Sequence, residues 1–173
     1  MANAFWDALE EKPYERITVR DVVDRAQVNR NAFYYHFQNI DDLAQWTIGE
    51  ELLTEVPELI VRGGIDEIIR LLNDPTSSQR IERIRLVAGS HGSKVHVRML
   101  EERFLQAWCD ALGIAEEDLS LQQSLTIRFV VGGLIAAVAS AEDVPNEELI
   151  RTALAAGIPE RMFALIVSNL GKI

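Results

Sequence analysis

Residues 17–43 read ITVRDVVDRAQVNRNAFYYHFQNIDDL, with a short helical pattern on either side of a break. Thr18 is the candidate N-cap of the first pattern, and Asp21 follows three positions later, where the second partner of a capping box belongs. Asn29 is the candidate N-cap of the second pattern. The break between the patterns is centred on residues 26–28. Two helices joined so closely predict a helix-turn-helix, which needs a third helix to bury its inner face.

The second of these helices has more aromatic and polar side chains than packing alone explains. Its apolar residues at inward-facing spacing are Val28, Ala32, Phe33 and Phe37. The rest of its surface consists of Arg30, Asn31, Tyr34, Tyr35 and His36, and no Asp or Glu lies between Arg25 and Ile40. Arg, Asn, His and Tyr side chains reach phosphates and base edges in a major groove. The alternative interpretation is an aromatic-rich helix that packs on another domain.

These residues resemble the N-terminal DNA-binding domain of the TetR family of bacterial transcription regulators, over residues 5–53. The resemblance rests on ITVRDV at 17–22, AQV at 26–28 and FYYHF at 33–37, followed by Asp41 and Leu43. The run YYHF with Leu43 six residues later is specific, because a generic helix-turn-helix lacks it.

The resemblance implies an all-α fold with a three-helix DNA-binding domain at residues 1–43 and a helical ligand-binding and dimerisation domain at 44–173. It also implies a ligand-responsive repressor that binds a palindromic DNA operator as a homodimer and responds to a small-molecule effector. The residues that it places on DNA are Thr18, Arg20, Asn29, Arg30, Asn31, Tyr34, Tyr35 and His36. Arg30 and Asn31 are expected at base edges, because Arg suits guanine and Asn suits adenine. Tyr34 and His36 are expected at phosphates.

The charge of the chain argues against a strong grip on phosphate. Its net charge is −10, and residues 1–42 hold five Lys or Arg against eight Asp or Glu, a net of −3. Phosphate neutralisation supplies much of the affinity of DNA-binding proteins. Ile40 stands where the family usually has a phosphate-contacting Lys, and Ala32 where a Ser or Thr is common; no basic arm precedes residue 2. The alternative function is therefore a TetR-like protein with weak or lost DNA binding that acts through a protein partner.

Gln27 occupies the turn position where the family usually has Gly. If the backbone there is left-handed, a residue with a side chain costs about 1 kcal/mol.

The remainder of the chain is helical in pattern, with breaks at Gly-, Pro-, Ser- and Asp-rich segments such as Gly63-Gly64. Helices are predicted at about 2–11, 41–54, 58–73, 77–88, 93–112, 118–141, 146–156 and 159–170. No segment alternates at period two, which supports the all-α class.

Small residues recur in FVVGGLIAAVASA, residues 129–141, where Gly133, Ala137 and Ala141 are four positions apart. A small face allows close helix approach, and a helix this apolar needs cover on several sides. It is either a buried core helix or part of a dimer interface. The resemblance favours a homodimer through 121–141 and 147–170. Thirteen residues are too few to span a bilayer, so we expect no membrane association.

A further set combines aromatic, Arg and His side chains that could line a small-molecule pocket between helices. Its members are Trp46, Arg85, His96, Arg103, Phe104, Trp108 and Arg128, with His91 and Arg98 less favoured. Each of them alone is more commonly a packing or surface residue.

Nothing in the sequence predicts catalysis, a metal site or a cofactor. His91 and His96 are five positions apart, and the chain has three His, one Cys and no H-E-x-x-H pattern. No Gly-rich phosphate loop or nucleophile elbow occurs, so an enzyme is not expected. The lone Cys109 excludes an internal disulfide, and no leader peptide opens the chain. These features indicate a cytoplasmic protein.

Overall fold

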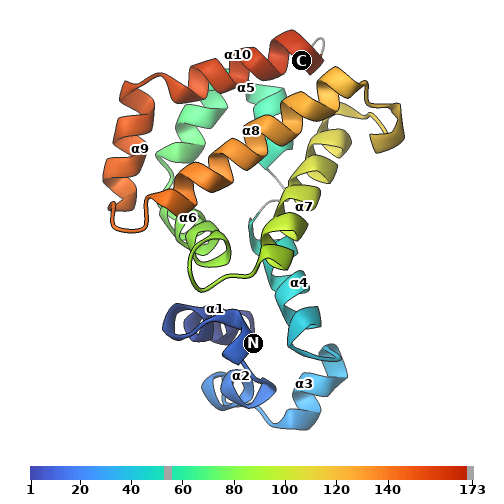
Figure 1. The fold of residues 1–173 in the computed structure, drawn as a ribbon, viewed down its shortest axis with the longest axis vertical. Helices are drawn as coiled ribbons and strands as arrows, with labels where there is room; N and C mark the ends of the chain where they lie inside the picture. The colour runs from blue at the N-terminus through green and yellow to red at the C-terminus, as the bar shows by residue number, and fades with distance from the viewer. Residues whose placement is uncertain (53–55, 171–173) are drawn as a thin grey trace.

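The computed structural model describes residues 1–52 and 56–170, and within those ranges it is all-α, as predicted (Figure 1). The N-terminal helices are α1 (Ala2–Glu11), the 3₁₀ turn η1 (Tyr14–Arg16), α2 (Val19–Ala26), α3 (Arg30–His36) and α4 (Ile40–Leu52). The others are α5 (Val56–Leu72), α6 (Pro75–Ala88), α7 (Lys94–Leu112), η2 (Glu116–Asp118), α8 (Leu121–Ser140), α9 (Asn146–Ala155) and α10 (Ile158–Leu170). Most predicted helices agree with these bounds to within about three residues. The predicted end of the fourth helix, Thr54, lies outside the described residues.

The first three helices form a small unit at one end of the molecule (Figure 1). Phe5 and Leu9 of α1, Val22 of α2 and Phe33 of α3 are almost completely buried against one another and against Leu43 of α4. Burial of each such side chain contributes about 1.5–3 kcal/mol before conformational entropy is counted. The helix-turn-helix therefore has the third helix that its inner face requires.

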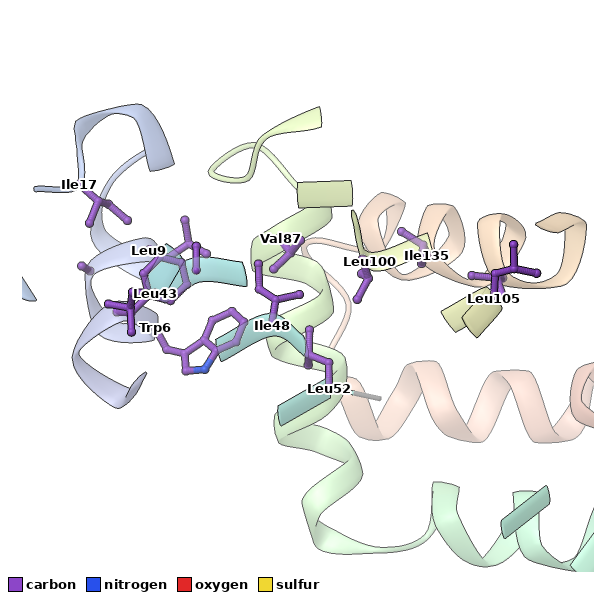
Figure 2. Packing of buried hydrophobic residues seen from close by; sticks show 14 of the residues in the cluster. Trp6, Leu9, Ile17, Leu43, Ile48, Leu52, Val87, Leu100, Leu105 and Ile135 are labelled. Carbon is purple, nitrogen blue, oxygen red and sulfur yellow. The ribbon is translucent and has the colours of Figure 1, made fainter. Parts of the chain in front are cut away.

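Helix α4 connects this unit to the rest of the protein. Leu43, Ile48 and Leu52 lie on its buried side, and the hydrophobic cluster continues from them to Val87 of α6 and Leu100 of α7 (Figure 2). The core is therefore continuous across the predicted boundary at residue 43. Helix α4 therefore packs on both sides of that boundary.

Helices α5 to α10 form the second layer, in which α8 packs on α6, α7 and α10. The predicted break at Gly63-Gly64 appears as a kink inside α5, where Gly64 has φ 63° and ψ −147°. This backbone conformation is open to Gly and strained for other residues.

Helix α8 is covered on one side only. Ile127, Val131 and Ile135 face the core, whereas Leu121 and Phe129 are more than 70% exposed. The prediction of a helix buried on several sides is therefore wrong for the single chain. Its 20 residues are also long and apolar enough to cross a membrane, a property that core helices of globular proteins share. The apolar run of 13 residues in the sequence was shorter than this helix.

Candidate functional site

The helix-turn-helix is fixed by the two caps predicted from the sequence. The Thr18 hydroxyl accepts a hydrogen bond from the Asp21 N–H at 3.3 Å, and the Thr18 N–H donates to the Asp21 carboxylate at 2.8 Å. Asn29 Oδ1 accepts from the Ala32 N–H at 2.8 Å and so begins α3. Both caps satisfy N–H groups that the first turn of a helix leaves without partners.

The turn between α2 and α3 depends on Gln27, which has φ 54° and ψ 40°. This left-handed conformation ends α2, and the Val28 N–H donates to the Val23 carbonyl at 3.0 Å across the turn. The left-handed conformation that the sequence analysis considered for Gln27 is therefore present. A side chain here costs about 1 kcal/mol, and the hydrogen bonds of the turn offset that cost.

Helix α3 lies at the end of the molecule farthest from α10 (Figure 1), and its polar side chains are exposed. Phe33 is fully buried and anchors it, whereas Tyr35 is 84% exposed. The exposed residues of α3 are Arg30, Asn31, Tyr34, Tyr35 and His36. Val28 was predicted to face inward and does not, because it belongs to the turn and is 36% exposed.

Ion pairs neutralise three of the five Lys and Arg side chains in residues 1–42. Lys12 lies 2.7 Å from Asp21, Arg20 lies 3.3 Å from Asp24, and Arg25 pairs with Glu11. The hydrogen bond from Lys12, together with that from Thr18, lowers the pKa of Asp21 to about 2. Of the five Lys and Arg in residues 1–42, this leaves two without an acidic partner among the residues that the structure describes. Those two are Arg16 and Arg30.

A cavity of about 470 Å³ lies between α4, α5 and α7. Its α7 wall consists of Arg103, Gln106, Ala107, Asp110 and Ala111, and the facing walls are Gly49 of α4 with Glu58, Val61 and Arg62 of α5. The volume is within the range of about 300–1,000 Å³ that small-molecule sites occupy. Only Arg103 among the seven predicted ligand residues lines this cavity. The other α7 residues of the cavity could have been identified by their helical spacing from Arg103, because they lie three, four, seven and eight positions after it.

The other six predicted ligand residues are scattered. Trp46 is exposed on α4, with its ring centroid 5.8 Å from that of Phe37. Arg85 lies 3.3 Å from Glu82 and donates to the Val144 carbonyl, and Arg128 lies 3.5 Å from Glu116. The remaining three are packing residues: His96, Phe104 and Trp108. The seven residues do not surround a common pocket.

Tyr14 joins the helix-turn-helix unit to the second layer. Its N–H donates to the His91 carbonyl at 2.8 Å, and its hydroxyl donates to the Asp41 carboxylate at the start of α4. Its ring meets the ring of His96 edge-on, with centroids 4.1 Å apart. His91 Nδ1 also lies 2.9 Å from the Leu9 carbonyl of α1. The N-terminal ends of α4 and α7 therefore meet at one tyrosine.

Burial at this junction shifts two pKa values. The pKa of Tyr14 is raised by burial and by its hydrogen bond to Asp41, so the phenol stays protonated. Burial lowers the pKa of His96 below 6.5, although the Asp41 and Glu15 carboxylates act in the opposite direction. Both groups are thus uncharged at neutral pH, and the junction holds as a network of hydrogen bonds and ring contacts.

Comparison with known proteins bears on this N-terminal unit. Residues 4–45 match the model for bacterial regulatory proteins of the tetR family. These residues are similar to the N-terminal domain of the TetR family. The predicted resemblance is thereby confirmed, and the matched range runs from α1 into α4, so the capped α2–turn–α3 unit lies within the TetR-like region.

A curated relative covers the same TetR-like region. Over 46 residues the chain is 37% identical to the HTH-type dhaKLM operon transcriptional activator DhaS of Lactococcus lactis subsp. lactis (strain IL1403). The aligned segment is 27% of this chain, and the chain spans about a quarter of the length of that relative. No solved structure matches the chain with statistical significance. Within residues 1–52 and 56–170, no group of three or more His, Cys, Asp or Glu is arranged to hold a metal ion.

Proposed function

We propose that the protein is a TetR-type DNA-binding transcription regulator that acts in the cytoplasm as a homodimer on an approximately palindromic operator. The observation that carries this proposal is the exposed polar face of α3, held by the Asn29 cap and the buried Phe33. Arg30 is the cation on this face that no carboxylate among the described residues neutralises, and Asn31 follows it. These two side chains suit guanine and adenine edges in a major groove.

The partner in the homodimer would cover the apolar face of α8. Leu121, Leu125 and Phe129 recur at four-residue spacing, are 77%, 58% and 74% exposed, and form a groove with Leu165 of α10. Gly133 continues the same stripe, and a Cβ added to it would meet no atom within 4 Å. For two copies of α3 to enter successive major grooves, the symmetric pair must hold them about 34–36 Å apart.

The cavity and the junction support a response to a small molecule. Helix α4 carries Asp41 at the Tyr14 junction and Gly49 at the cavity. Helix α7 carries His96 at the junction and Arg103 at the cavity. Each pair is seven or eight residues apart, about 10–12 Å along a helix. A ligand that moves α4 relative to α7 would therefore act on both groups that hold Tyr14. This is coupling between two distinct sites.

We infer that the ligand weakens DNA binding and that the protein is a repressor. DhaS is named as an activator, so the direction of regulation needs its own test. Expression of a reporter placed behind the operator is expected to rise when the gene for this protein is deleted. A fall in expression would make the protein an activator.

Replacing Arg30 or Tyr34 with Ala tests the DNA-binding proposal directly. Each variant is expected to lose about 1–3 kcal/mol of operator affinity, measured by filter binding at fixed salt with DNA that flanks the gene. Arg98→Ala is the matched control, because Arg98 is an exposed arginine on α7 paired with Glu102 at 3.0 Å. Full affinity in both α3 variants would refute the assignment of α3 to DNA.

The ion pairs within residues 4–45 favour a second candidate function. In this second function the protein has little DNA affinity of its own and acts by binding a protein partner. Lys12, Arg20 and Arg25 are neutralised by carboxylates within the chain. The same filter-binding experiment separates the two candidates. Tight, sequence-selective retention of DNA by the unmodified chain excludes the partner-only function.

A further inference from the structure

We propose that the cavity between α4, α5 and α7 binds a small dipolar molecule, with a carboxylate at Arg103 and an ammonium group toward Asp110. This inference rests on the proposed ligand-responsive regulator and specifies the ligand class of that site.

The two charges stand at opposite ends of one face of α7. Arg103, Gln106, Ala107, Asp110 and Ala111 follow the i, i+3, i+4, i+7, i+8 pattern of a single helical face, and all five line the cavity. Seven residues of helix separate Arg103 from Asp110, which corresponds to about 10.5 Å along the axis. The cavity therefore has a positive end and a negative end along its length.

Arg103 is placed to receive an anion. Among the described residues no carboxylate pairs with it, whereas Arg62 on the facing wall is neutralised by Glu58 at 2.6 Å. Its guanidinium lies against the bare backbone of Gly49, at 3.5 Å from the position that a Cβ there would occupy. A guanidinium offers a fork of N–H donors that matches a carboxylate with two parallel hydrogen bonds.

Asp110 is placed to receive a cation. The described contact of its carboxylate is a hydrogen bond from the uncharged Gln106 amide at 2.8 Å, so its negative charge is not neutralised. Between the two ends lie the apolar side chains of Val61, Ala107 and Ala111, which suit a short chain of methylene groups.

The arrangement distinguishes among ligand classes. An apolar ligand would take Arg103 and Asp110 out of water without replacing their hydration, which costs several kcal/mol. A simple anion would pair with Arg103, but it would supply no positive group for the Asp110 carboxylate. A molecule with both charges satisfies both ends, and this is why the proposal commits to a dipolar ligand.

Isothermal titration calorimetry on the full chain tests the proposal, with a series of ω-amino acids from 4-aminobutanoate to 8-aminooctanoate as probes. Hexanoate and hexylamine are the matched probes that keep a single charge. We expect measurable binding for at least one ω-amino acid, and about tenfold or greater weakening for both single-charge probes, as loss of a charge-assisted hydrogen bond implies. Absence of binding across the whole series would overturn the proposal.

Two variants identify the site. Arg103→Gln and Asp110→Asn are each expected to weaken binding of the ω-amino acid about tenfold or more, whereas Arg98→Gln on α7 outside the cavity leaves it unchanged. Unchanged binding to Arg103→Gln would overturn the assignment. If Arg103→Gln does not fold, unchanged binding to Asp110→Asn would overturn it instead. DNA retention by the unmodified chain is measured without probe. Failure of the ligand proposal thus remains distinct from failure of the proposed function.

Discussion

Asp24 holds the guanidinium of Arg20 on the exposed surface of α2, in a pair separated by 3.3 Å. Exposed pairs of this kind contribute about 0.2–1 kcal/mol to stability. Their larger effect here is on DNA, because Arg20 is among the residues that the family resemblance places on the operator. At the proposed DNA interface, the Asp24 carboxylate would both neutralise that cation and repel the phosphate backbone.

Asp24→Asn is therefore expected to tighten operator binding. The variant makes Arg20 available to one further phosphate, so the slope of log affinity against log salt concentration should steepen by about 1. Binding is measured by filter retention at several salt concentrations. Asp66→Asn, which makes the same charge change at an exposed site on α5, is the control for net charge and should leave the slope unchanged. An equal effect of the two substitutions would show that Arg20 does not contact DNA.

The sequence predicted the caps at this scale and missed the ion pairs that join different helices, for a physical reason. Thr18 and Asn29 bond to backbone N–H groups within three residues, so local sequence is sufficient to identify them. The pair between Arg25 and Glu11 joins α2 to α1 across fourteen positions. Its formation depends on how the helices pack, which no local pattern contains.

At the scale of elements, the junction at Tyr14 makes stability depend on pH. Burial lowers the pKa of His96 below 6.5, whereas in the unfolded chain the imidazole titrates near that value. As pH falls through about 6.5 the unfolded chain therefore takes up a proton that the folded chain does not. The contribution of neutral His96 to stability is present above this pH and is lost as pH decreases below it.

His96→Gln is expected to flatten the dependence of unfolding free energy on pH between about pH 5 and 7, the window in which an imidazole titrates. The groups that face His96 across the junction, Tyr14, Asp41 and Glu15, remain in place in the variant. Urea denaturation at a series of pH values provides the measurement. His36→Gln, at an exposed histidine of α3, is the control and should keep the original slope. A slope in His96→Gln equal to that of the unmodified chain would contradict this origin.

Helix positions were largely predictable, whereas the cavity was not. Periodic apolar residues identify helices because every turn must place one on the buried face. The seven candidate ligand residues were chosen by type, and type does not say which face of a helix a residue occupies. Arg103 lines the cavity together with Asp110, whereas His96, about two turns nearer the N-terminus of α7, lies beyond the cavity and packs against Tyr14.

At the scale of the whole molecule, α8 leaves an apolar stripe exposed that a single chain in water would bury. The stripe contains Leu121, Leu125 and Phe129, and it is continuous with Leu165 of α10. Large exposed apolar patches mark surfaces that another molecule covers. We propose that a second copy of the chain covers this stripe, because a two-fold axis would pair the two α3 helices with two halves of an operator.

Phe129→Asp tests whether this stripe forms the dimer. Each copy would lose about 1.5–3 kcal/mol of apolar burial, and the two-fold axis doubles that loss while bringing two carboxylates into the interface. We expect the variant to sediment as a monomer and to bind the operator more weakly, because each half-site must then be occupied independently. Val95→Asp is the matched control, since Val95 is 72% exposed on α7 outside the stripe, and it should remain dimeric. A dimer that survives Phe129→Asp, or an unmodified chain that is monomeric and partitions into lipid vesicles, would show that α8 meets another surface.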